Sequence, residues 1–139
     1  MTQEENMDRR NRGSQWVLIA GILTVLLGLI HVAATPVIFS TMSDQLSAAD
    51  KLTFLYMYIA TGAAVIFVGW LIIYGSRGLR TSERWAWITT LAAGVFMSLL
   101  GIGAILTMSD NPFAYLTLVF AALELVPLWL YRHEFQPAS

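Results

Sequence analysis

Four long apolar runs limit what this chain can fold into. They cover residues 16–39, 52–74, 85–108 and 112–131. A helix that crosses the hydrocarbon core of a bilayer needs about 20 mostly apolar residues, and each run reaches that length. The runs are far longer than the roughly 9–11 residues of a membrane β-strand, and their polarity does not alternate. Because a backbone in lipid must satisfy its own hydrogen bonds, we predict four transmembrane helices.

The composition is typical of a membrane protein and excludes several functions. Hydrophobic residues make up 57% of the 139 residues and charged residues 12%, and a soluble domain carries about twice that charged share. The net charge of -1 provides no basic surface for a nucleic acid. With no cysteine and two histidines, the chain lacks a thiolate or three-histidine metal site. We therefore expect no metal and no other cofactor.

Short connections predict how the helices are arranged. Segment 40–51 is rich in residues that cap helices, among them Ser47, and 75–84 contains two glycines. Segment 109–111 is a tight turn before Pro112, and proline suits the first turn of a helix. Short connections force consecutive helices to lie antiparallel. The expected fold is an all-α, four-transmembrane-helix up-down-up-down bundle, with residues 16–131 as one transmembrane domain.

The distribution of basic residues predicts the orientation in the membrane. Seven arginines fall in the tails 1–15 and 132–139 or in segment 75–84, whereas Lys51 falls on the other side. This bias places both tails in the cytoplasm. We expect residues 1–15 to be disordered. The first apolar run exceeds the about 7–15 residues of a signal-peptide core, so we expect it to be retained.

Small residues recur at helical spacing in every run and predict the faces on which the helices meet. Lipid provides no hydrophobic drive between helices, so close contacts form where small side chains let backbones approach. The candidate packing residues are Gly21, Gly28, Gly62, Gly94, Ser98 and Gly101. The last three also form a stripe that could join two copies of the chain. The expected partners are the lipid bilayer and either a second copy or a larger membrane complex.

Two ionisable residues, His31 and Glu124, lie deep in the apolar runs. A charge at the centre of a bilayer costs about 2.5–3.5 kcal/mol on insertion scales, so both groups are either functional or neutral and hydrogen-bonded between helices. Desolvation disfavours a charged carboxyl group, and we expect Glu124 to be neutral. The helical rise places the two residues about 8–12 Å apart in depth. The candidate intramembrane polar site consists of His31, Thr35, Tyr58, Thr61 and Glu124.

No catalytic motif is present, and we expect no catalytic residue. The favoured function is a non-catalytic packing or accessory subunit. The alternative is a small proton- or cation-coupled transporter that uses Glu124 and His31. A membrane-embedded enzyme or redox protein is less favoured, because one histidine and one glutamate are too few.

The arrangement of four helices with one buried glutamate is similar to that of small multidrug transporters. In that family the glutamate lies in the first helix, where this chain has His31, so the resemblance is limited to architecture. The chain also looks like four-helix bacterial inner-membrane proteins, which implies a location in the inner membrane.

Overall fold

The computed structural model describes residues 3–135, and these residues fold into helices. The long helices are α1 (Gln3–Met42), α2 (Ala48–Arg80), α3 (Arg84–Thr107) and α4 (Pro112–Leu130), and the short ones are the 3-10 helix η1 (Ser43–Gln45) and α5 (Arg132–Phe135). All four long helices are long and apolar enough to cross a membrane, and no strand occurs in the described part of the chain. The predicted all-α four-helix fold is confirmed, and the chain is a multi-pass membrane protein.

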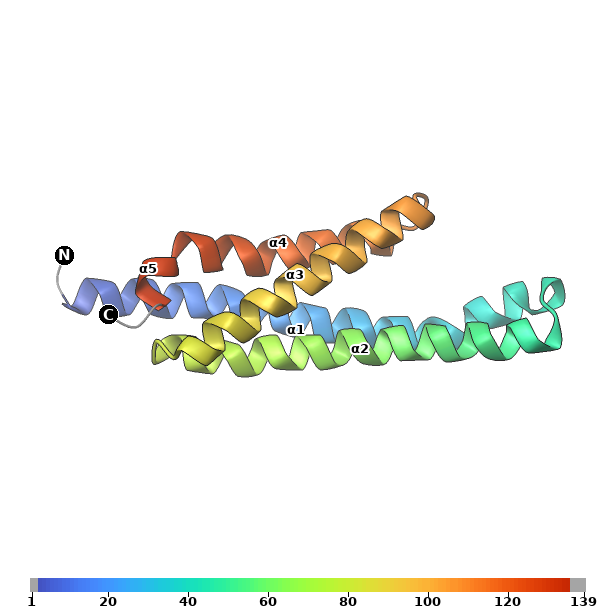
Figure 1. The fold of residues 1–139 in the computed structure, drawn as a ribbon, viewed down its shortest axis with the longest axis horizontal. Helices are drawn as coiled ribbons and strands as arrows, with labels where there is room; N and C mark the ends of the chain where they lie inside the picture. Colours follow the sequence, from blue (N-terminus) through green and yellow to red (C-terminus); the bar gives the residue numbers. More distant parts are fainter. Residues whose placement is uncertain (1–2, 136–139) are drawn as a thin grey trace.

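The four long helices form a ring of neighbours. Helix α1 packs against α2 and α4, and α3 packs against the same two helices. Figure 1 shows two hairpins, α1–α2 and α3–α4, with α3 crossing obliquely from α2 toward the far end of α4. Both described ends of the chain lie at one end of the molecule (Figure 1).

The two hairpins differ in length. Helix α2 has 33 residues and α4 has 19, which correspond to about 50 Å and about 28 Å. Gly13 of α1 lies against Tyr131 at the end of α4. Counting residues along both helices from this contact shows that the start of α4 is level with about residue 32 of α1. The part of α1 that follows residue 32 therefore has no α4 beside it. The tip of the α1–α2 hairpin accordingly extends beyond the tip of α3–α4 (Figure 1).

We call the projecting part of this hairpin, residues 33–42 and 48–61, the outer arm. Thr35 is its one buried residue, and residues 48–61 include none. The buried core lies instead where all four helices pack together. Its largest apolar side chains are those of Ile72, Leu79, Met97, Leu128 and Phe135.

The expected disorder of residues 1–15 is wrong for residues 3–15, which form the first turns of α1. These turns are held by contacts that cannot be seen in a local sequence window. The Arg10 guanidinium donates to Ser82 Oγ at 2.7 Å, and Arg9 pairs with Glu134 at 3.1 Å. The fully buried Phe135 ring packs on Gly13. Residues 1–2 and 136–139 lie outside the described part of the chain.

The connection expected over 75–84 is also shorter than predicted, because α2 continues to Arg80. Gly75 and Gly78 do not break the helix. They allow α3 to approach closely: a Cβ atom on Gly78 would lie 2.6 Å from the Cβ atom of Ala86. The turn is left to residues 81–83, where Ser82 takes a φ of 56°.

The other helix ends follow simple capping chemistry. Ser47 Oγ accepts a hydrogen bond from the Asp50 backbone N–H at 3.2 Å and begins α2. Asn111 Oδ1 accepts from the Phe113 N–H at 3.0 Å, and Pro112 occupies the first turn of α4. These caps allow the two hairpin turns to be short.

Candidate functional site

The α1–α2 contact is built on two pairs of glycines. A Cβ atom on Gly28 would lie 2.9 Å from the carbonyl oxygen of Gly62. Seven residues away on each helix, a Cβ atom on Gly69 would lie 3.0 Å from the carbonyl oxygen of Gly21. The backbones of α1 and α2 touch at these positions, so no larger residue fits without a shift.

The stripe that was expected to join two copies lies inside one chain. Gly94 faces Leu125 of α4, and Gly101 faces Leu118 of the same helix. Ser98 is partly buried, and its hydroxyl donates to the Gly94 carbonyl oxygen at 2.9 Å. These residues therefore pack α3 on α4 and are already covered in a single copy.

Glu124 is buried in the contact between α3 and α4. Its side chain is 1% exposed, and neither carboxyl oxygen has a hydrogen-bond partner within the described residues. The buried threonine hydroxyls do not serve it, since each donates to the carbonyl oxygen four residues earlier on its own helix. These pairs are Thr24 with Ala20, Thr35 with His31, Thr90 with Ala86, and Thr117 with Phe113. Within residues 3–135, the core thus holds one carboxyl group that has no hydrogen-bond partner.

His31 lies on the α1–α2 contact, where the outer arm begins. Its ring stacks on Tyr58, with the centroids 4.0 Å apart and the planes at 15°. Phe54 continues the aromatic row, with its centroid 5.5 Å from that of Tyr58. The His31 Nε2 atom is buried and has no hydrogen-bond partner in the described part of the chain.

The two threonines of the candidate site bond to their own helices. Thr35 Oγ1 donates to the His31 carbonyl oxygen at 3.3 Å, and Thr61 Oγ1 donates to the Met57 carbonyl oxygen at 2.8 Å. Neither hydroxyl is directed to another helix by these bonds, so the threonines do not connect His31 with Glu124.

The structure does not bring Glu124 next to His31. Because Tyr131 lies against Gly13, Glu124 is level with about residue 20 of α1, and His31 is about 16 Å farther along the axis. The candidate site therefore divides into an aromatic pair on α1–α2 and an isolated carboxyl group between α3 and α4. The separation exceeds the predicted 8–12 Å because α4 begins well short of the tip of the longer hairpin, so that His31 lies level with the start of α4.

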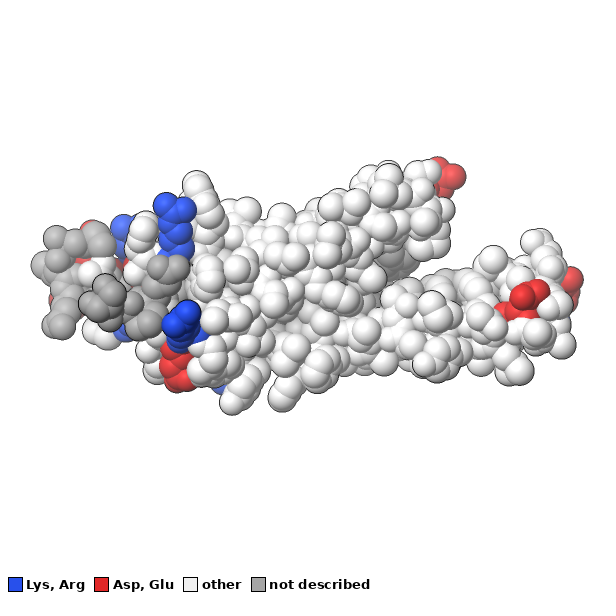
Figure 2. All heavy atoms as spheres, viewed as in Figure 1, with Lys and Arg blue, Asp and Glu red and all other residues white. Residues whose placement is uncertain are grey.

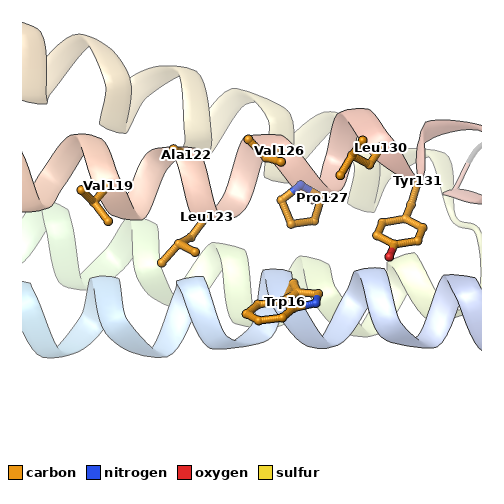
Figure 3. A pocket seen from close by; sticks show the side chains of 8 residues that line it. All are labelled: Trp16, Val119, Ala122, Leu123, Val126, Pro127, Leu130 and Tyr131. Carbon is orange, nitrogen blue, oxygen red and sulfur yellow. The ribbon is translucent and has the colours of Figure 1, made fainter.

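A groove between α1 and α4 was not predicted. It has a volume of about 410 Å³, and Figure 3 shows Leu123 and Pro127 directed from α4 toward Trp16 of α1. The remaining lining residues are Val119, Ala122, Val126, Leu130 and Tyr131. Apart from the Trp16 indole N–H and the Tyr131 hydroxyl, which lie toward one end, the lining side chains are apolar (Figure 3).

A charged pocket of about 460 Å³ adjoins this groove and shares Leu130 and Tyr131 with it. Its charged lining comes from one face of α1, with Glu5, Asp8, Arg9 and Arg12 at helical spacing. The sequence shows this spacing, but the spacing places the four residues on one face only if the segment is a helix. Because we expected this segment to be disordered, the pocket was not predicted.

A third recess lies on the outer arm. It has a volume of about 330 Å³ and is lined by Leu52, Leu55, Tyr56, Ile59 and Ala60 of α2. Within residues 3–135, no group of three or more acidic or histidine side chains is placed to hold a metal ion.

No protein-family model matches the chain, and neither does any curated protein or solved structure.

Proposed function

We propose that this chain is a non-catalytic membrane protein that assembles with a second copy of itself through the outer arm. The supporting observation is the unequal length of the two hairpins. Helices α3 and α4 cover α1 and α2 along most of the bundle but stop short of the arm (Figure 1). Two antiparallel helices remain there without the neighbours that the rest of the molecule has.

The outer arm exposes large apolar side chains. Leu52 is 74% exposed and Tyr56 72% on α2, and Val37 is 67% exposed on α1. Counting along the helices from the Gly28–Gly62 and Gly13–Tyr131 contacts places these side chains level with or beyond the polar turn of the shorter hairpin. Apolar surface near or beyond the membrane boundary gains about 25 cal/mol per Å² when it is removed from water. A second protein surface would supply that burial.

The shape of the arm favours a second copy as the partner. Leu52, Tyr56 and Ile59 follow steps of four and three residues and so share one face of α2. The same residues border the recess of about 330 Å³. The face therefore has both projecting side chains and a hollow, which a two-fold symmetric interface requires. Two arms would together form a four-helix contact.

The same proposal places both termini in the cytoplasm and the protein in the inner membrane. Support comes from seven arginines on the side of the tails and one lysine on the other side. In Figure 2, blue basic atoms gather at the end where the termini lie, and the visible hairpin tips carry red acidic atoms. Reporter fusions at Ser139 should read cytoplasmic, and fusions at Ser47 should read external. A cytoplasmic reading at Ser47 would refute this orientation.

The oligomeric state tests the assembly directly. The parent chain in mild detergent should have the mass of a dimer after correction for bound detergent. Replacing Leu52, Tyr56 and Ile59 together by alanine should give a monomer. The matched control is Leu99→Ala on α3, where the parent side chain is 65% exposed, and it should remain dimeric. A monomeric parent chain would rule out the proposal.

A second candidate function is proton or cation transport through Glu124. It is favoured by one observation, the unpartnered carboxyl group at 1% exposure. In proteoliposomes, the parent chain would then carry protons or a coupled cation across the membrane, and Glu124→Gln would abolish that flux while the fold survives. Equal flux in the parent and the variant would exclude this function.

A further inference from the structure

The groove between α1 and α4 has the length and the apolar lining of a site for one lipid chain. It is lined along α4 from Val119 to Leu130, a length of about 16 Å, which matches half of a hydrocarbon core of about 30 Å. Tyr131 lies at the end of the groove where α4 ends, and Trp16 lies opposite Pro127 (Figure 3). Tyrosine and tryptophan are enriched at the level of lipid headgroups. This length and these aromatic residues are those expected of a groove that runs through one leaflet of a membrane.

The charged pocket lies where the headgroup of such a lipid would be. It shares two wall residues with the groove, so a molecule can occupy both. Glu5, Asp8, Arg9 and Arg12 follow steps of three, one and three residues, which places both charge signs on one face of α1. The side chains of Asp8 and Arg12 are exposed. Arg9 is also engaged with Glu134 at 3.1 Å, which leaves Arg12 as the main cation for a ligand.

We infer that the groove and the charged pocket together bind one phospholipid whose headgroup carries a phosphate and a primary ammonium group, that is, phosphatidylethanolamine. An acyl chain fills the apolar groove. The phosphate pairs with Arg12, because guanidinium groups match phosphate oxygens. The ammonium group donates hydrogen bonds to Asp8. This inference does not depend on dimerisation, because both pockets belong to a single copy.

Because the pocket contains both a carboxylate and a guanidinium group, it should favour the phosphatidylethanolamine headgroup over other headgroups. A phosphatidylglycerol headgroup offers the phosphate but no cation for Asp8. A phosphatidylcholine headgroup has a cation without N–H groups, so it cannot donate to the carboxylate. We therefore expect phosphatidylethanolamine to bind more tightly than either of the other two lipids.

The inference can be tested by native mass spectrometry of the purified chain in detergent. Each of the three lipids is added in turn. The parent chain should retain one phosphatidylethanolamine with an affinity about fivefold higher than for the other lipids, as expected for one additional partly exposed ion pair. Equal binding of all three lipids would overturn the headgroup assignment.

Three variants separate the parts of the site. Arg12→Gln should weaken binding of all three lipids about fivefold, because each of them carries a phosphate. Asp8→Asn should weaken phosphatidylethanolamine alone, so that its retained phosphatidylglycerol binding shows that the variant is folded. Leu123→Trp should fill the groove and reduce binding of all three lipids.

The control for the groove variant is Val95→Trp, on an exposed face of α3, which should bind as the parent does. Unchanged binding in Leu123→Trp would overturn the groove as the chain site. Loss of phosphatidylglycerol along with phosphatidylethanolamine in Asp8→Asn would overturn the role of its carboxylate.

Discussion

The carboxyl group of Glu124 lies against Gly94: a Cβ atom on Gly94 would be 3.1 Å from Glu124 Oε2. The same atom would lie 2.6 Å from Leu125 Cδ2. Gly94 thus provides the space in which the glutamate is buried, and α3 and α4 can be this close only because position 94 has no side chain.

Replacing this glycine should separate α3 from α4. We expect Gly94→Ala to lower the free energy of unfolding by about 1–3 kcal/mol, the usual cost of an added methyl group in a packed contact. Gly103→Ala is the matched control, since no atom lies within 4 Å of its Cβ position, and it should cause no loss. Unfolding in detergent measures both. Equal effects of the two variants would show that the α3–α4 contact is not tight at Gly94.

The carboxyl group of Glu124 should lower the stability of the fold. Its carboxyl oxygens have no partner within the described residues, and a buried polar group without a partner costs about 1–3 kcal/mol. We expect Glu124→Met, which keeps the volume but removes the polar atoms, to raise the melting temperature. Glu124→Gln should melt like the parent. Clear destabilisation by Glu124→Met would contradict the absence of a partner.

Ser82 joins three segments at the end of the molecule near the termini. Its Oγ accepts from Arg10 at 2.7 Å and donates to the Glu134 carbonyl oxygen at 3.0 Å, and its φ of 56° is one that favours glycine. Ser82→Gly loses both bonds but relieves the backbone, whereas Ser82→Ala loses both bonds and keeps the strain. We expect the alanine variant to be less stable than the glycine variant by about 1–2 kcal/mol. Equal melting of the two variants would show that the left-handed turn is not strained.

Glu83, in the turn before α3, should make stability depend on pH. Hydrogen bonds from the Trp85 indole and the Thr81 hydroxyl lower the pKa of Glu83 below its ordinary value of 4.5. The charged form is therefore favoured in the folded state. Its contribution is present above pH 4.5 and is lost as the pH falls through the lowered pKa. In melting experiments, Glu83→Gln should be less stable than the parent at neutral pH, and the difference should disappear on acidification. A difference that does not change with pH would contradict this role.

The four membrane helices could be predicted, because an apolar run of about twenty residues in lipid satisfies its backbone hydrogen bonds only as a helix. The ends of the helices could not be predicted, because contacts with other helices determine where each helix begins and ends. Gly75 and Gly78 resemble loop residues in sequence, yet they lie in α2, where α3 approaches. Residues 3–15 resemble a disordered tail, yet Ser82, Glu134 and Phe135 hold them in place.

The sequence indicates which polar residues lie deep in the apolar runs, but it does not indicate how they are arranged. Burial of Glu124 follows from its place in an apolar stripe. Its distance from His31 depends on the unequal lengths of the hairpins, which hydropathy does not reveal. The stacking of His31 on Tyr58 depends on the register of α1 against α2, and that register is set by the paired glycines.

Cysteine cross-linking in membranes tests the proposed assembly most directly. The chain has no cysteine, so a single introduced cysteine can form a disulfide only with a second copy or another protein. Cysteines placed at Leu52, Tyr56 or Ile59 should give a covalent dimer on mild oxidation, and a cysteine at Val95, on an exposed face of α3, should not. If all three arm positions stay monomeric, or if Val95 cross-links as well as they do, the outer arm is not the interface between copies.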